Sequence, residues 1–382
     1  MNYPSSISRR AALASVTSAG AALLSASRSQ TLAAPSARRE GPIRIGVISA
    51  AIHGKPQPRN GHTWHFAQYL HPEFNWAAMK KHYAQAHPSF ERVYRNPNFN
   101  FSGQLPFPNT RIAAYYDPDT AAAQAFAEVF PGVEVARSLD ELVNSVDAVW
   151  MGDASGFGED HFELVAPGLQ KGLPTFCDKP IGGTVDGTKK ILDLAQNRKA
   201  PLMSSSIFRY EFGMEAALRM RDSGEFGPIE FITATLHSRY KLESWMIYGQ
   251  HPVWSVMTLM GAGAEAVCMI EHKDTCHALI TWPDRYPTHV WYGEPFEKFE
   301  YNRTSIHFKK KPYTFTPSIE GNFEYGHHYE MFRMAAAFRE MIITRQEPVP
   351  HQEILEVTAI VHAGARSLSE GNRFVKLAEV MP

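Results

Sequence analysis

The chain has few cysteines, no excess of charge of either sign and no long hydrophobic run. Its 382 residues include 3 cysteines, an odd number that excludes a disulfide scaffold. The 38 basic and 39 acidic side chains nearly cancel, so the charge does not indicate nucleic acid or an anionic membrane surface as a partner. Beyond the first 40 residues we find no internal repeat and no low-complexity segment. A chain of this length can form two domains with full cores.

The first 40 residues have the composition of an export signal. Ser8-Arg9-Arg10 precedes a modestly apolar run over residues 11–24, and Ala, Ser and Thr then dominate until Ala37. This order resembles a twin-arginine signal cleaved between about Ala26 and Ala37. The apolar run is too short for a stable membrane anchor. We therefore expect a periplasmic or otherwise exported protein. The alternative is an amphipathic or disordered tail.

Residues 41–207 predict a Rossmann-like α/β domain with a doubly wound parallel sheet. Apolar, β-branched runs such as IRIGVIS alternate with segments of helical periodicity. An insertion with several loop-forming prolines occupies about residues 72–109. We expect strands at residues 43–49, 110–116, 133–136, 148–151, 173–177 and 201–206, with helices at 62–70, 120–130, 139–143, 161–171 and 187–197.

The stretch GFGEDHFELVAPGLQKGLPTFCDKPIGGT, residues 156–184, closes a helix–strand unit with Asp178-Lys179-Pro180. Ligands bind beyond the carboxyl ends of strands in open α/β sheets, and burial can lower the pKa of a lysine held there. Lys179 is therefore a candidate proton-transfer group. The alternative is a surface lysine that follows a strand. The pattern HxELxxPxLxxGxPxFxDKP resembles the signature of the Gfo/Idh/MocA oxidoreductases, which usually ends in Glu-Lys-Pro.

A second motif, residues 245–252, resembles the Gly-x-His turn of that family at the start of a helix. The resemblance implies that His251 is the acid/base group that faces the substrate carbon. Tyr248 and Tyr240 are candidate hydroxyl partners. Ile247 and Trp254 stand where the family often has aspartates. A histidine at a helix N-terminus has its cationic form disfavoured and so is ready to accept a proton. The alternative is a capping histidine without chemistry.

The dinucleotide fingerprint Gly-x-Gly-x-x-Gly is degenerate here. The six positions after the first strand read Ser49-Ala50-Ala51-Ile52-His53-Gly54, and a Cβ at the second glycine position hinders the approach of a pyrophosphate. The family resemblance nevertheless implies NAD or NADP. The residues expected to bind the cofactor are Ser49, Ala51, Gly54, Asp117, Asp153, Asp178 and Lys179.

Two of these acidic residues have alternative roles. Asp117 follows the second strand, where an acidic residue binds the adenosine ribose, but it also suits a turn that starts a helix. Asp153 follows the strand at residues 148–151, and a carboxylate there would favour the oxidised, cationic nicotinamide. It could equally hold a sugar hydroxyl or a metal.

Six histidines fall between residues 53 and 87. His62 and His65 are three residues apart on one helix face, and His53 is the nearest third ligand for a metal. The alternative is a solvated histidine face, because no carboxylate or cysteine stands at ligand spacing.

Residues 208–382 predict an α+β domain with a broad, mostly antiparallel open sheet. Alternating strands are expected at residues 229–237, 264–270, 275–282, 288–292 and 298–307, and long helices at 325–343 and 351–368. By resemblance, this domain binds the substrate and makes a homo-oligomer, either a dimer or a tetramer. The residues expected to contact the substrate are Arg209, Tyr240 and Trp245.

These features together predict an exported NAD(P)-dependent oxidoreductase that transfers a hydride to or from a secondary alcohol of a sugar, polyol or related compound. Lys179 would polarise or deprotonate the hydroxyl, and His251 would relay the proton. A nicotinamide cofactor is scarce outside the cytoplasm, so we expect it to stay bound. Two alternatives remain: a non-redox lyase or hydrolase on a sugar derivative, with or without a metal, and a non-catalytic sugar-binding protein.

Overall fold

The first sheet has six parallel strands in the order β5-β4-β1-β6-β7-β8 in the computed structural model. The strands are β1 (Ile43–Ser49), β4 (Thr110–Tyr116), β5 (Glu134–Val135), β6 (Ala148–Gly152), β7 (Thr175–Cys177) and β8 (Leu202–Met203). The order reverses between β1 and β6, as in a doubly wound dinucleotide fold, so the predicted Rossmann-like sheet is confirmed. The structure describes residues 41–57, 59–84, 91, 105, 107–154, 156–237, 241–293, 303–316 and 323–382, with side chains in the last range from His328 onwards.

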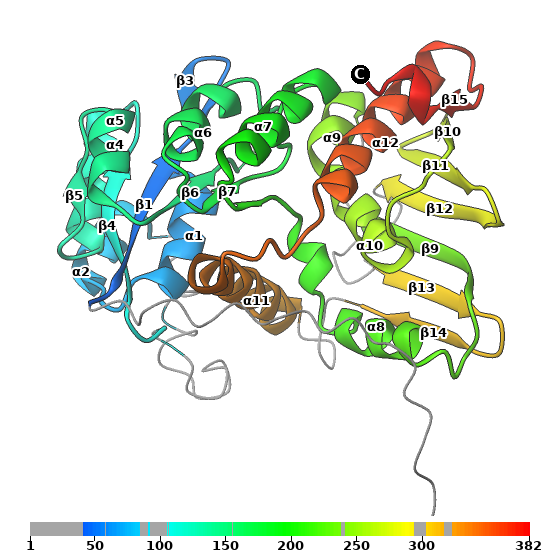
Figure 1. The fold of residues 1–382 in the computed structure, drawn as a ribbon, viewed down its shortest axis with the longest axis horizontal. Helices are drawn as coiled ribbons and strands as arrows, with labels where there is room; N and C mark the ends of the chain where they lie inside the picture. Colours follow the sequence, from blue (N-terminus) through cyan, green and yellow to red (C-terminus); the bar gives the residue numbers. More distant parts are fainter. Residues whose placement is uncertain are drawn as a thin grey trace, which may run out of the picture. The chain divides into compact units, whose positions relative to one another are not determined.

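Helices cover both faces of this sheet: α6 and α7 lie on one face, and α1 and α11 lie on the other (Figure 1). Side-chain N-caps on Asn60, Asp119, Ser138 and Thr184 start four of the helices in this half. The helices are α1 (Gly61–Leu70), α2 (Trp76–His82), α4 (Thr120–Val129), α5 (Leu139–Ser145), α6 (His161–Gln170), α7 (Val185–Arg198) and α11 (Phe323–Thr344).

The helix α11 lies far along the chain but packs on the first sheet. Trp150 of β6 stacks on Phe176 of β7 at 3.9 Å between ring centroids, and Phe338 of α11 meets Trp150 edge-on at 5.2 Å. Large buried aromatic rings contribute much of the apolar area in such a core. The α11 segment therefore belongs by sequence to the predicted second domain and by packing also to the first.

A small hairpin follows β1 at the position of the degenerate glycine fingerprint. Its strands β2 (Ala51–Ile52) and β3 (Lys55–Pro56) are joined by a two-residue turn in which both His53 and Gly54 have positive φ, at 49° and 72°. Two-residue hairpin turns of this kind need positive φ, which glycine adopts at low cost. Gly54, expected to bind a cofactor, is therefore a turn residue in an exposed hairpin.

The second sheet has seven strands in the order β14-β13-β9-β12-β11-β10-β15. Its pairs are antiparallel except for β9 with β12, which are parallel. The strands are β9 (Ile229–His237), β10 (Ala266–His272), β11 (Thr275–Trp282), β12 (Arg285–Gly293), β13 (Arg303–Phe308), β14 (Pro312–Phe315) and β15 (Val375–Lys376). The mostly antiparallel sheet is confirmed. The strand expected at residues 298–307 corresponds to β13, and residues 294–302 lie outside the described part.

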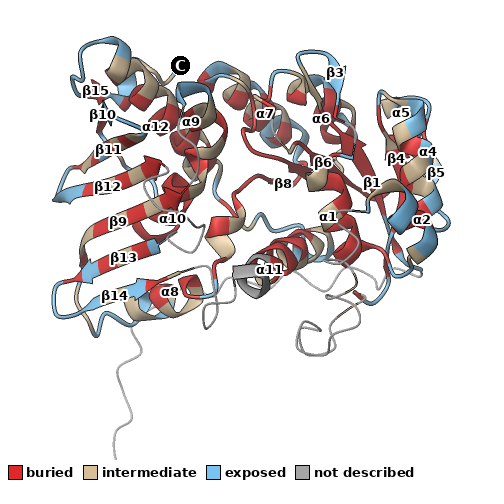
Figure 2. Cartoon of the chain, turned by 180° about the vertical axis from the view of Figure 1, so that it is seen from behind, coloured by how far each residue is buried: buried red, intermediate tan, exposed pale blue. Residues whose placement is uncertain are grey.

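Helices cover one face of this second sheet, and the same arrangement is seen from both sides (Figures 1 and 2). The described helices of this half are α8 (Met214–Ser223), α9 (Leu242–Tyr248), α10 (Gln250–Met260) and α12 (His351–Ser369), with short 3-10 turns at Ile207–Tyr210 (η2) and Leu377–Glu379 (η4). Side chains such as Cys276, Ala278 and Ile280 of β11 alternate towards the helices and are fully buried.

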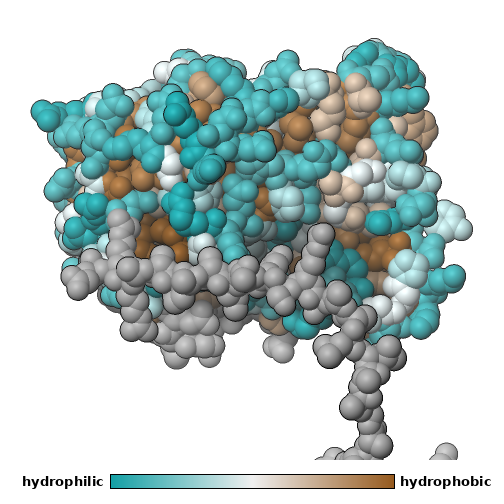
Figure 3. Space-filling model, viewed as in Figure 1, coloured by the Kyte–Doolittle hydropathy of each residue, from teal (hydrophilic) through white to brown (hydrophobic). Residues whose placement is uncertain are grey.

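Hydrophilic residues predominate on the molecular face seen in Figure 3, where the hydrophobic ones are recessed between them. Among the helices that the structure describes, none combines the length and the hydropathy that a membrane span requires. Residues 1–40 lie outside the described residues. The export signal expected there therefore stays a prediction.

Candidate active site

A cavity with about 630 Å³ of empty space, partly open to solvent, lies beyond the carboxyl ends of β7 and β8. This is the edge of a parallel sheet where ligands bind. Five parts of the chain contribute its lining: the start of α1 with His62, Asp178 and Lys179 after β7, residues 205–207 after β8, His251 in α10, and Met331 with Met334 of α11. The structure therefore places Lys179, His251 and Asp178, three of the predicted site residues, around one cavity.

Lys179 is the most unusual of these side chains. It is only 2% exposed, and its Nζ atom has no hydrogen-bond partner among the described residues. Its Nζ atom lies 5.1 Å from the centroid of the Tyr248 ring. A buried ammonium without an acceptor is costly, so the site is suited to a ligand that supplies one. Tyr248, predicted as a hydroxyl partner, thus lies near both Lys179 and His251.

His251 lies at the start of α10, where the chain turns out of α9. Its Nδ1 atom lies 2.5 Å from Ser206 Oγ, which also accepts the backbone N–H of Phe208. The Ser206 hydroxyl can therefore donate its own proton to Nδ1, which fixes the orientation of the His251 ring in the cavity wall. The His251 ring stacks with Tyr248 at 6.0 Å. Ser206 was not predicted, although it follows a strand at the same sheet edge.

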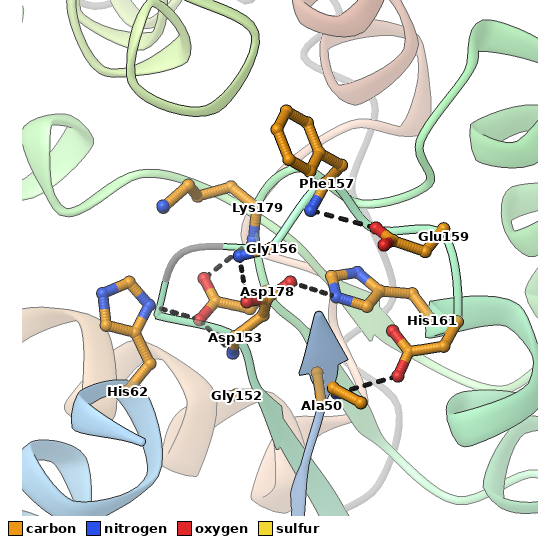
Figure 4. A network of polar contacts seen from close by, with 12 residues as sticks. Ala50, His62, Gly152, Asp153, Gly156, Phe157, Glu159, His161, Asp178 and Lys179 are labelled. Carbon is orange, nitrogen blue, oxygen red and sulfur yellow. Dashed lines mark hydrogen bonds and ion pairs between the residues drawn. The ribbon is translucent and has the colours of Figure 1, made fainter. Parts of the chain in front are cut away.

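His62 and Asp178 form a pair that sequence reasoning did not anticipate. His62 Nδ1 lies 2.5 Å from Asp178 Oδ2, which also accepts the backbone N–H of Asp153 at 3.0 Å. Asp178 Oδ1 accepts the N–H of Lys179 at 2.7 Å. In the view of Figure 4, His62 and the Lys179 amine lie on one side of Asp178, and His161 lies on the other. Asp178 thus anchors the segment that carries Lys179.

The metal alternative on His53, His62 and His65 is not supported. His53 pairs with Glu159 at 3.0 Å, whereas His65 Nε2 lies 3.4 Å from the hydroxyl of Tyr83. The three rings therefore have different partners and do not converge. Within the described ranges, no group of three or more His, Cys, Asp or Glu side chains is placed to hold a metal ion.

Asp153 lies in the interior and not on the cavity wall. Its carboxylate accepts hydrogen bonds from Gln57 Nε2 at 2.7 Å and from the N–H of Gly156 at 2.6 Å, and it pairs with His161 at 2.9 Å. Burial opposes its charge, but these bonds outweigh burial and lower the pKa of Asp153 to about 2. The expected contact between Asp153 and a nicotinamide or a sugar is therefore corrected to a structural role.

Asp117 and Ser49 are buried at the ends of β4 and β1. Asp117 accepts the N–H of Asp119 at 2.8 Å and the hydroxyl of Tyr115 at 3.3 Å, while Ser49 Oγ accepts from Asn60 at 3.2 Å. Burial raises the pKa of the Asp117 carboxyl above its usual value. The side chain that caps α4 is that of Asp119. The turn expected at Asp117 is therefore present, and it does not exclude a role of Asp117 in cofactor binding.

The backbone N–H groups after β1 are already used by carboxylates of the chain. The N–H of Ala51 donates to Asp160 Oδ2 at 2.8 Å, and the N–H of His53 donates to Glu159 Oε1 at 2.9 Å. Both acidic residues come from the turn between β6 and α6. Ala51 is thus engaged in a contact within the protein at the place where it was expected to meet a cofactor.

Two expected substrate contacts are corrected, and a third falls outside the described residues. Arg209 donates to Glu353 at 3.0 Å and to Thr258 at 3.3 Å, so its guanidinium holds η2 to α12 and α10. Trp245 is fully buried and donates its indole N–H to the carbonyl of Val361 at 3.0 Å. Neither residue lines the cavity. Tyr240 lies outside the described residues.

The comparisons with known proteins agree with this geometry. Residues 96–206 match the family model described as "Oxidoreductase family, NAD-binding Rossmann fold". An "Uncharacterized oxidoreductase" of Streptococcus pneumoniae is 28% identical over 173 residues, which are 41% of this chain and 46% of that protein. An "Inositol 2-dehydrogenase" of Pseudomonas fluorescens is 30% identical over 123 residues, which are 31% of this chain and 36% of that protein. The chain thus spans less than half of the length of these curated relatives.

Two solved structures extend the likeness to nearly the whole described chain. Scyllo-inositol dehydrogenase from Lactobacillus casei, with bound NAD(H) and scyllo-inositol, has a TM-score of 0.67 at 16% identity and covers 88% of this chain and 99% of its own. Myo-inositol dehydrogenase from the same organism, with NAD(H) and myo-inositol, has a TM-score of 0.68 at 15% identity and covers 88% and 96%. At these identities the likeness shows the fold alone. With the match of residues 96–206 to the family model and the partial matches to the curated relatives, it makes the chain similar to the Gfo/Idh/MocA oxidoreductases, most directly in its NAD-binding half.

Proposed function

We propose that this protein is an NAD(P)-dependent oxidoreductase that acts on a secondary alcohol of a cyclitol, polyol or sugar. One observation carries the proposal: the buried Nζ atom of Lys179, without a partner among the described residues, faces a cavity at the carboxyl edge of the parallel sheet. An alcohol oxygen is the acceptor that this ammonium lacks. The inositol dehydrogenases among the relatives and the solved neighbours support the choice of a cyclitol.

The residues that line the cavity fit the nicotinamide end of a dinucleotide cofactor. The strand order reverses between β1 and β6, which opens the crevice where dinucleotides bind. Lys179 and Asp178 would lie beside the nicotinamide end, and Asp117 at the end of β4 would lie towards the adenosine ribose. When bound, the cofactor supplies the hydride acceptor or donor.

The protein residues hold the alcohol and move its proton. Lys179 binds the hydroxyl oxygen and, in its neutral form, accepts the hydroxyl proton as the carbonyl forms. His251, fixed by Ser206, lies on the wall of the same cavity and passes the proton on. Asp178 holds the backbone of Lys179, and His62 closes the cavity at the first turn of α1.

A second candidate function is a lyase or hydrolase that uses the same proton-transfer groups without a nucleotide. The observation that favours it is the engagement of the Ala51 and His53 N–H groups by Asp160 and Glu159. Metal assistance on His53, His62 and His65 is no longer part of this alternative. A non-catalytic sugar-binding role is less consistent with a buried lysine that lacks an acceptor.

Export and assembly belong to the same proposal. The order of residues 1–40 supports a twin-arginine signal and a periplasmic location, which would favour a cofactor that stays bound. No described helix covers the outer face of the second sheet, which exposes Leu279 of β11 and Ile270 of β10. This face supports a homo-oligomer.

The test is turnover by the purified mature protein with NAD or NADP and a panel of inositols, polyols and sugars, followed by the absorbance of the reduced nicotinamide. The expected result is reduction with at least one cyclitol or polyol. Release of nucleotide on denaturation would identify a retained cofactor. Absence of reduction with every alcohol, together with absence of any nucleotide after denaturation, would overturn the redox assignment in favour of the nucleotide-free alternative.

A further inference from the structure

Two carboxylates of the chain occupy the backbone donors that follow β1. The N–H of Ala51 lies 2.8 Å from Asp160 Oδ2, and the N–H of His53 lies 2.9 Å from Glu159 Oε1. In dinucleotide folds the first turn after β1 presents its N–H groups to the cofactor's pyrophosphate. A carboxylate on such an N–H makes the same charge-assisted hydrogen bond as a phosphate oxygen.

The acidic turn is held in place from its own side. Gly158 has a φ of 79°, and a Cβ on it would lie 2.3 Å from the carbonyl oxygen of Pro180. The carbonyl of Gly158 also accepts the N–H of Gly183 at 3.1 Å. The turn at residues 156–160 is thereby fixed to the loop that follows Lys179, and Glu159 and Asp160 are directed towards the hairpin.

The hairpin is held from the other side by further contacts. His53 Nδ1 pairs with Glu159 Oε1 at 3.0 Å, and the His53 ring stacks on Phe157 with 5.6 Å between centroids. Gln57, just after β3, donates to the buried Asp153 at 2.7 Å. The two loops at the switch point of the sheet are therefore joined to each other by three acidic side chains from residues 153–160.

We propose that Glu159 and Asp160 are an internal substitute for the cofactor's diphosphate, which a dinucleotide must displace in order to bind. This inference rests on the proposed function, because it concerns the cofactor of that reaction. The carboxylates and the diphosphate cannot accept hydrogen bonds from the same N–H groups at the same time. As like charges in close proximity, they also repel each other. The pair thus sets the affinity of the site for a diphosphate while leaving the cavity around Lys179 unaffected.

The test compares the wild-type protein with the double variant Glu159→Ala/Asp160→Ala by isothermal titration calorimetry. The probe is ADP-ribose, which carries the diphosphate without the nicotinamide, and the second ligand is nicotinamide mononucleotide, which has one phosphate. The expected result is a gain of about tenfold or more in ADP-ribose affinity, the effect of one charge-assisted hydrogen bond. Affinity for nicotinamide mononucleotide is expected to change less.

Two further variants keep the comparison interpretable. Glu163→Ala removes an exposed acidic side chain from the first turn of α6 and serves as the matched control, with wild-type affinities expected. Glu159→Gln/Asp160→Asn removes the charges and keeps an acceptor oxygen, so it is expected to fold as the wild type does and to show an intermediate gain. Circular dichroism checks the fold of each variant.

Equal ADP-ribose affinity in the wild type and both double variants would overturn the inference and leave the proposed function standing. Failure of all three proteins to bind ADP-ribose or NAD would overturn both, because the acidic pair would then not be what keeps the diphosphate out. A gain confined to the double variants supports the inference even if no substrate has yet been found.

Discussion

The imidazole of His161 lies 2.9 Å from the carboxylate of Asp153, and neither side chain is exposed to solvent. Burial disfavours a charged imidazole, but the bond to Asp153 and the neighbouring Cys177 raise the pKa of His161 well above its usual value. The two side chains thus form a buried ion pair. It holds the start of α6 to the end of β6.

Removal of one charged partner from this ion pair should lower the free energy of unfolding. In Asp153→Asn the buried His161 loses its counter-charge, and loss of one partner of a buried ion pair typically costs about 3–5 kcal/mol. Urea unfolding followed by circular dichroism at pH 7 measures the loss. The double variant Asp153→Asn/His161→Gln should lose less than the sum of the two single variants, because the residues are coupled. Additive losses would contradict the pairing.

Protonation of Asp153 should lower the free energy of unfolding at acid pH. The pKa of Asp153 is lowered in the folded state to about 2, from about 3.8, so its contribution is present above pH 3.8. That contribution is lost as the pH falls towards 2. Unfolding free energies of the wild type between pH 5 and pH 2 should therefore fall more steeply than those of Asp153→Asn.

Two buried carboxyls, those of Glu211 and Glu330, should lower the free energy of unfolding as the pH rises. Burial, and then the neighbouring Glu330, raise the pKa of Glu211 well above its usual value, and burial does the same for Glu330. Because the pKa of Glu211 is higher in the folded than in the unfolded state, its contribution to the free energy of unfolding is fully present below about pH 4.5. This contribution is lost as the pH rises through the folded-state pKa.

The change Glu211→Gln should therefore reduce the fall in melting temperature between pH 5 and pH 8. The control is Glu225→Gln, which alters an exposed carboxylate and should keep the wild-type profile. Melting curves at matched ionic strength measure both variants. A profile of Glu211→Gln that is as steep as that of the wild type would show that Glu211 does not titrate in this range.

Ser206 should act through His251. If its hydroxyl fixes the ring of His251, Ser206→Ala should lower kcat with little change in KM, and Ser206→Thr should restore most of the rate because it keeps the hydroxyl. His251→Gln removes the imidazole to which we assign proton transfer and should lower kcat by about 10²–10⁴-fold. A Ser206→Ala enzyme with the wild-type rate and pH profile would remove Ser206 from the mechanism.

The regular part of the fold follows from local patterns in the sequence. The bounds of β1, β4, β9 and β11 coincide with the apolar or alternating runs that predicted them. Lys179 was expected at the carboxyl edge of the parallel sheet because it follows a strand there, whereas His251 was expected at the site only from the resemblance of its motif to the family's Gly-x-His turn. The parallel pairing of β9 with β12 was not foreseen, since alternation has the same period in parallel and antiparallel strands.

What the sequence did not predict depends on contacts between distant residues. His62 and Asp178 are 116 residues apart, and no local pattern relates them. Arg209 follows β8 at the ligand edge, but Glu353, 144 residues later, takes its guanidinium. Trp245 stands in the motif of His251, yet its ring packs against Gly249 and donates to a carbonyl of α12. The degenerate fingerprint signalled an altered loop, although it could not show that Glu159 and Asp160 reach it.

The most direct test of the account is the change Lys179→Met, because methionine has a similar length and no charge. The variant should lose nicotinamide reduction by about 10²–10⁴-fold with the best alcohol substrate. Its melting temperature should be unchanged or raised, because an apolar side chain relieves a buried ammonium without an acceptor. Lys189→Met, on the exposed side of α7, is the control. Wild-type turnover in Lys179→Met, or a large loss of stability, would contradict the role assigned to Lys179.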